Sequence, residues 1–218
     1  MHSRYADWLA YVFDRPETPS GWYFDLEVEP FDGNLADIVE LVALTMENCG
    51  VDLAKYSNTQ VAHGLKYIFS CSCSDIVFAL MDDSVAISMR LRAIASLKSL
   101  YRDCFTPRCD PALGHLSDPC ENPLNYPCHM LWDFSPLSYW ESRSNKYTFY
   151  GAVVDVLEDA LLSPNPACVE SALHGLGHIQ SSYDDRVSQV ITNYLKKNKN
   201  LLPALRAYAE SAKVGNVQ

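Results

Sequence analysis

Apolar residues recur every three to four positions along most of the chain, with polar residues between them, and this spacing predicts amphipathic α-helices. The pattern is clearest in five segments, namely residues 35–49, 84–105, 147–162, 183–195 and 201–212. Asn165 followed by Pro166 predicts another helix start, as an N-cap and a first helical residue. Asn200 predicts a similar start for the last helix. The chain is therefore expected to be all-α.

One charged residue interrupts this pattern. Arg90 falls on the apolar stripe of the segment 84–105. A buried arginine is tolerated when its charge is paired. Two interpretations stay open: Arg90 is paired with an acidic side chain, or the buried face is rotated slightly from the predicted one.

Two segments resemble each other. "VAHGLKYI" at 61–68 aligns with "ALHGLGHI" at 172–179, so that His63 matches His174 and Gly64 matches Gly175. We expect both to be the second helix of a helical hairpin, with the glycines allowing close approach of a neighbouring helix. The whole pattern predicts four stacked hairpins, over residues 35–70, 74–105, 147–179 and 183–212.

Two stretches lack the helical period. Residues 15–34 are rich in proline, glycine, acids and aromatics, and predict either a loop over the first helices or a short strand. Residues 106–145 contain six of the twelve prolines and predict a long irregular insertion. The expected organisation is one domain, 1–218, with two hairpins in 35–105, the insertion in 106–145 and two hairpins in 146–218.

The hairpin "PACVESALHGLGHIQSSYDDRVSQVITNYL" resembles one unit of the HEAT-repeat class, and "LRAYAESAKVGNVQ" is similar to the ends of many uncharacterised bacterial HEAT-like proteins. The resemblance covers most of 35–105 and 146–218, whereas 106–145 departs from it. It implies an α-solenoid, a right-handed helical stack whose usual work is to hold other proteins.

The composition and net charge of the chain limit the classes of molecule that it is expected to bind. The chain has 218 residues, is 48% hydrophobic and 20% charged, and carries a net charge of −10. This charge argues against nucleic acid and favours a basic protein partner. We read no signal peptide and no membrane-spanning window, so we expect a cytoplasmic protein without membrane contact. In that compartment the eight cysteines are expected to be reduced.

Glu170, His174 and His178 are spaced four apart and so form one stripe on a helix. We expect this stripe to lie on the exposed face, opposite the core, where it contacts a partner. The alternative is metal binding by the same three residues. Zincin chemistry is excluded because Gly175 stands where an HExxH motif has glutamate. The equivalent positions of the earlier hairpin are Thr59, His63 and Tyr67, which are not a metal set, and no cofactor is expected.

The insertion offers two further candidates. Six cysteines and histidines lie in or just before the insertion, namely Cys104, Cys109, His115, Cys120, Cys128 and His129. Their spacing matches no standard zinc motif, so separate packing of these side chains is favoured over a zinc site. Its aromatic run, "CHMLWDFSPLSYW", contains Trp132 and Trp140. Trp132 is expected to pack onto the helices and Trp140 to be the more exposed of the two, as an anchor for a partner.

These patterns predict a non-catalytic protein-binding scaffold, in its sharpest form a bacterial immunity protein that caps a basic toxin. No nucleophile motif selects a catalytic residue, and the lack of a basic groove disfavours an enzyme acting on DNA bases. The alternative is a metal-binding protein or metal-dependent enzyme. The residues expected to bind the partner are Glu170, His174, His178, His63, Tyr67, Asp184, Asp185, Trp132 and Trp140.

Overall fold

The computed structural model describes all residues except 1, 19, 20 and 218, and this part of the chain is helical without strands. The first half contains α1 (His2–Phe13), α2 (Leu35–Glu47), α3 (Cys49–Asp52), α4 (Asn58–Phe69), α5 (Ile76–Ala79), α6 (Ile87–Ala95), α7 (Leu97–Ser99) and α8 (Thr106–Arg108). The second half contains α9 (Asn125–Phe134), α10 (Lys146–Ala160), α11 (Pro166–Ile179), α12 (Asp184–Lys197) and α13 (Pro203–Ala212). The predicted all-α class is confirmed.

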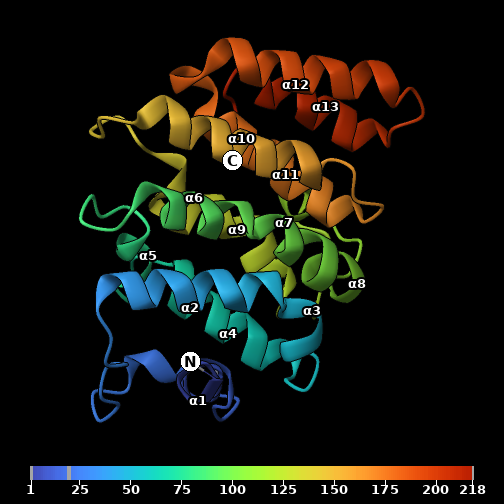
Figure 1. Ribbon diagram of the computed structural model, residues 1–218. Coiled ribbons are helices and arrows are strands. Elements are labelled where there is room, and N and C mark those ends of the chain that lie inside the picture. Colours follow the sequence, from blue (N-terminus) through green and yellow to red (C-terminus); the bar gives the residue numbers. More distant parts are fainter. Residues whose placement is uncertain (1, 19–20, 218) are drawn as a thin grey trace.

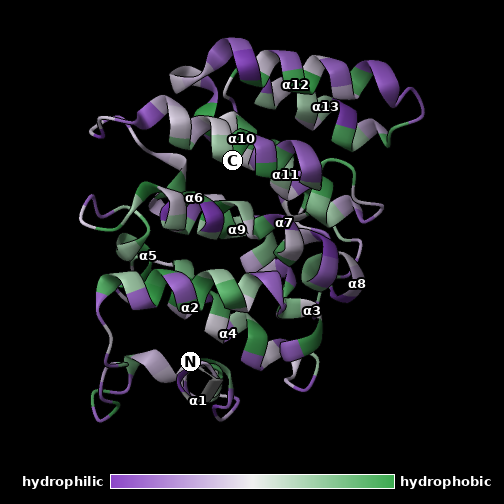
Figure 2. Ribbon diagram, viewed as in Figure 1, coloured by the Kyte–Doolittle hydropathy of each residue, from purple (hydrophilic) through white to green (hydrophobic). Residues whose placement is uncertain are grey.

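The longer helices form two rows that lie one behind the other (Figure 1). One row consists of α2, α6, α10 and α12, each packed on the next, and the other consists of α4, α9, α11 and α13. Helix α1 packs on α4 and α2 at one end of the stack. Figure 2 shows α2 largely in hydrophobic colours, whereas α12, at the far end, alternates between hydrophilic and hydrophobic positions. The core therefore runs between the rows along the whole stack.

The helix starts follow local capping chemistry. Asn165 accepts a hydrogen bond from the backbone N–H of Ala167, with Pro166 as first helical residue, which confirms the predicted start of α11. The last helix begins at Pro203 rather than at Asn200. A residue that precedes proline is held out of the α-region, so Leu202 stays extended and the helix starts one residue later.

The predicted helix 84–105 is present as α6 and α7, which continue through a π-helical segment, Leu100–Phe105, into α8. Arg90 is buried there, with its side chain 3% exposed. One guanidinium nitrogen donates to Asp83 at 2.9 Å, and the guanidinium lies 4.8 Å from the centre of the Phe149 ring. The first of the two interpretations of Arg90, pairing with an acid, is confirmed.

The sequence analysis expected the segment 106–145 to be irregular, but part of it is helical. It contains α9, which lies in the second row between α4 and α11. Pro127 falls in the first turn of α9, where proline leaves no intrahelical hydrogen bond unmade. In the expected hairpin 74–105, α5 packs on α2 and α4, whereas α6 packs on α2 and α10, so the two do not form a separate pair. The segment 15–34 contains a 3₁₀ turn, Trp22–Phe24, and no strand in its described part.

The two HGL segments lie in α4 and α11, as predicted. Gly175 is buried, and a Cβ atom there would come within 2.8 Å of Leu157 on α10 and of the Trp132 ring on α9. Gly64 occupies the matching place in α4, where a Cβ would come within 2.3 Å of the Phe13 ring. The predicted close approach of neighbouring helices at these glycines is confirmed.

Candidate metal centre

Helix α11 is enclosed rather than half exposed. It packs against α9, α10, α12 and α13, and every residue from 167 to 177 is buried. Glu170 and His174 are each only 1% exposed, so the expected exposed stripe is wrong for both. Of the three predicted stripe residues only His178 reaches the surface, with its side chain 31% exposed.

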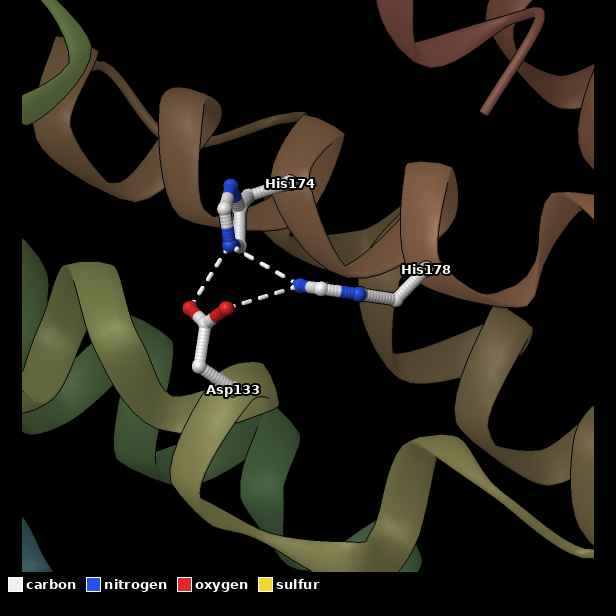
Figure 3. Close-up of side chains that lie close together, drawn as sticks. All are labelled: Asp133, His174 and His178. Atoms are coloured by element: carbon white, nitrogen blue, oxygen red, sulfur yellow. Dashed lines mark hydrogen bonds and ion pairs between the residues drawn. The ribbon is translucent and has the colours of Figure 1, made fainter. Parts of the chain in front are cut away.

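His174 and His178 meet a carboxylate from the neighbouring helix α9, that of Asp133 (Figure 3). The Nε2 atom of His174 lies 2.6 Å from Oδ2 of Asp133, and the Nε2 atom of His178 lies 3.0 Å from Oδ1. The two Nε2 atoms lie 3.0 Å apart. Three side chains that can ligate a metal, from two helices, therefore place one ligand atom each within 4.8 Å of the others.

Hydrogen bonds to Asp133 account for two of the three contacts but leave the contact between the two Nε2 atoms without a proton. Each Nε2 atom carries at most one proton, so two protons are available for the three contacts. If both protons point to Asp133, the two N–H groups lie side by side and repel each other. If one of the two protons points to the other imidazole, it no longer forms a hydrogen bond to the carboxylate. A cation at the same point would use a lone pair from all three ligand atoms.

The distances are close to those of a bound metal ion. Ligand atoms around a tetrahedral zinc ion, with bonds of about 2.0–2.1 Å, lie roughly 3.3 Å apart. Here the two Nε2 atoms lie 3.0 Å apart, and each lies 2.6 or 3.0 Å from a different oxygen of Asp133, so that side-chain rotations would bring one oxygen and both nitrogens to that spacing. The other ring nitrogen of His174, Nδ1, lies 2.5 Å from the hydroxyl of Tyr208 on α13. Such a contact orients the ring of a metal-ligating histidine.

The charge on Asp133 suits a ligand. Burial alone would raise the pKa of this carboxyl group, but hydrogen bonds from His174 and His178 outweigh burial and hold the pKa well below its usual range. Asp133 is therefore ionised at neutral pH. Its side chain is 28% exposed, so the site opens to solvent on the side of Asp133 and His178.

Glu170 belongs to a separate cluster. Its carboxylate accepts hydrogen bonds from the backbone N–H groups of Gly114 and His115, at 2.7 and 2.9 Å. The His115 ring contacts the same carboxylate, and Nδ1 of His129 lies 3.4 Å from it. Burial acts to raise the pKa of Glu170, but these donors lower it to about 2. The alternative metal set of the sequence analysis is therefore not the one that the structure brings together: Asp133, and not Glu170, lies with His174 and His178.

The sequence analysis missed Asp133 because it treated the aromatic run of α9 as packing material. The available signal was His129 and Asp133, spaced four apart and so on one face of a helix. The expected separate packing of the insertion's cysteines and histidines is wrong for His115 and His129, which meet at Glu170, and for Cys128, which lies beside Cys109. Within the described ranges, the Asp133 trio is the only group of three or more histidine, cysteine or acidic residues whose ligand atoms converge.

The remaining predicted partner-binding residues are dispersed. Trp132 and Trp140 are 1% and 0% exposed, so the expected exposure of Trp140 is wrong. The indole N–H of Trp140 donates to the carbonyl of Leu137 and its ring stacks on Phe149. Tyr67 is also buried, and His63 is half-buried in α4. Asp184 and Asp185 are exposed in the first turn of α12.

Comparison of the chain with family models, with curated proteins and with solved structures found no match. In the part of the chain that the structure describes, none of the helices combines the length and the apolar character that a membrane crossing needs. The functional interpretation therefore depends on the geometry of the site. Two imidazoles and one carboxylate, fixed on adjacent helices and open on one side, can hold a divalent ion and leave it accessible.

Proposed function

We propose that the protein binds a divalent first-row transition ion, such as Zn²⁺ or Fe²⁺, through Asp133, His174 and His178. The observation that carries the proposal is the convergence of two imidazole nitrogens and one carboxylate, with one ligand atom of each residue within 4.8 Å of the others. Imidazole and carboxylate ligands suit these ions, and a set of two histidines and one carboxylate is common to catalytic zinc and non-haem iron sites.

The coordination shell would be incomplete. Three protein ligands leave at least one position of a tetrahedral ion for water or a substrate. Asp133 and His178 are both partly exposed, so that position faces the accessible side of the site. A bound ion would lower the pKa of a coordinated water molecule and polarise a coordinated carbonyl or phosphoryl group. The site thus supports a metal-dependent activity as well as metal binding.

The test is metal titration of the chelator-treated, metal-free protein, with Zn²⁺ and Fe²⁺ in separate arms. We expect one ion per chain for the preferred metal by calorimetry and elemental analysis. Co²⁺ should give the visible absorption of a low-coordinate site. His178→Ala should weaken binding at least about 10-fold, because it removes one of three ligands and alters a partly exposed side chain.

His63→Ala is the matched control, because His63 lies in the HGL segment of α4 and outside the trio. This variant should bind metal as the wild type does. Absence of stoichiometric binding by both metals, or equal loss in the two variants, would refute the proposal.

Protein binding remains a second candidate. We propose that the two helical rows form a short HEAT-like solenoid that holds a basic protein, such as a toxin, in the cytoplasm. The net charge of −10 and the exposed pair Asp184 and Asp185 support it. Co-expression with the product of the adjacent gene should give a stoichiometric complex that salt weakens, and Asp184→Asn with Asp185→Asn should slow its formation. Recovery of free monomer alone would contradict this candidate.

A further inference from the structure

A cavity of about 370 Å³ lies at the α1 end of the stack, away from the Asp133 site. Its size falls in the range of about 300–1,000 Å³ that is usual for small-molecule sites. Helix α1, the segment after Gly21, helix α4 and the residues before α5 contribute to its walls. The residues that matter for its chemistry are Tyr11, Trp22, Phe31, Tyr67, Cys73 and Asp75.

Four aromatic rings form a connected cluster in this wall. The centre of the Trp22 ring lies 4.6 Å from that of Tyr67 and 5.3 Å from that of Tyr11. Phe31 lies 5.3 Å from Tyr11 by the same measure. Aromatic rings carry negative charge on their faces, so a cavity lined by several rings attracts a cation.

The protein already places one of its own cations on this cluster. The guanidinium carbon of Arg15 lies 4.5 Å from the centre of the Tyr11 ring and 4.4 Å from that of Trp22. Arg15 lines a neighbouring cavity and not the aromatic one, whereas Trp22 lines both. Trp22 thus lies between Arg15 and the aromatic cavity, and the same group of rings that holds the guanidinium on one side lines the cavity on the other.

Asp75 supplies the counter-charge. Its side chain is exposed, lines the aromatic cavity and makes no capping hydrogen bond to the helix that it precedes, α5. The hydroxyl of Ser74, which also lines the cavity, donates to the carbonyl of Tyr67. A methylated ammonium group needs no hydrogen-bond acceptor, so ring faces and one carboxylate are sufficient to bind it.

We propose that the aromatic cavity of Tyr11, Trp22, Phe31 and Tyr67 binds a small methylated ammonium ion, with Asp75 as its counter-ion. The proposal is independent of the metal site, because none of Asp133, His174 and His178 lines this cavity. Trp22 adds a second indication of a ligand: it is 6% exposed, and its indole N–H has no acceptor among the described residues. A buried donor without an acceptor is uncommon and calls for an external oxygen or water.

The test compares choline with 3,3-dimethyl-1-butanol, which has the same shape but a carbon in place of the charged nitrogen. Both are titrated by calorimetry and by the NMR shifts of the tryptophan indole protons. We expect saturable binding of choline at the Trp22 signal and binding of the neutral alcohol that is at least about 10-fold weaker. Equal binding of the two compounds, or no saturable binding of choline, overturns the proposal.

Single substitutions test whether choline binds in the aromatic cavity. Asp75→Asn changes an exposed side chain and should weaken choline several-fold without weakening the alcohol. Asp185→Asn removes one negative charge from the other end of the stack and should leave choline binding unchanged, so it controls for the net charge. Trp22→Leu should abolish binding if it folds. Equal choline affinities in the Asp75 and Asp185 variants would place the ion outside this cavity and refute the proposal.

Discussion

Replacement of Glu170 by glutamine should destabilise the protein by roughly 3 kcal/mol at neutral pH. Glutamine is a neutral mimic of the protonated carboxyl group. The pKa of Glu170 is lowered from its ordinary 4.5 to about 2, and that difference sets the magnitude. Glu170 is 1% exposed, so solvent does not screen its interactions. The side-chain amide of glutamine would face one of the donors that now point to the carboxylate, which are Gly114, His115 and His129.

The dependence on pH has a definite sign. Because the folded-state pKa lies below the ordinary value, the stabilisation is fully present above about pH 4.5 and is lost as pH falls toward about 2. The difference in unfolding free energy between wild type and Glu170→Gln should therefore shrink over that range. Urea unfolding, followed by circular dichroism with chelator present, measures the difference at each pH.

Glu121→Gln is the matched control, because Glu121 is exposed in the same segment as His115. It should change the unfolding free energy by less than about 0.5 kcal/mol. A destabilisation below about 1 kcal/mol at pH 7 would refute our account of the Glu170 cluster, as would a difference that stays constant down to pH 2. Glu170→Gln should also retain metal binding, since Glu170 is outside the trio. Loss of metal by the folded variant would instead support the alternative ligand set of the sequence analysis, Glu170, His174 and His178.

Two further predictions concern packing. Gly175→Ala should cost about 1–3 kcal/mol in urea unfolding, because its Cβ would come within 2.8 Å of Leu157 and Trp132. Gly151→Ala in α10 should stabilise the protein by about 0.5–1 kcal/mol, because nothing lies within 4 Å of the added Cβ. A Gly175→Ala variant more stable than Gly151→Ala would contradict the helix packing. Trp8, Trp22, Trp132 and Trp140 are all 6% exposed or less, so acrylamide should quench the native fluorescence weakly. Strong quenching would show that at least one of these indoles is at the surface.

The fold was predictable where one face of a helix is buried. The apolar stripes of 35–49 and 147–162 correspond to α2 and α10, and the alignment of His63 with His174 placed both HGL segments correctly in helices. The prediction failed for α9. Its apolar side chains, Cys128, Leu131 and Trp132, follow the helical spacing, but the prolines around them outweighed that short signal. Proline count is a weak guide because a proline in the first turn does not interrupt a helix.

The site was only half predictable, for a different reason. His174 and His178 were recognised as a pair on one helix and named as ligands in the alternative interpretation, since spacing along one helix is visible in the sequence. Their orientation was predicted incorrectly, because one-sided burial was assumed for a helix that has neighbours on several sides. The spacing of His129 and Asp133 indicates a shared helix face, but the contact of Asp133 with α11 depends on tertiary packing and could not be assigned without α9 in place.

The packing of α9 on α11 also explains how the three side chains of the site are held in position. Trp132, next to Asp133, has its indole N–H bonded to the hydroxyl of Tyr101, and its ring fills the space left by Gly175, next to His174. A larger residue at 175 would push α9 away from α11 and separate Asp133 from both histidines. The glycine thus fixes the distance between the two helices that supply the ligands, and the tryptophan fixes the rotation of α9. This contact holds the carboxylate and the imidazoles together in the metal-free protein, so the proposed metal binding would need little reorganisation.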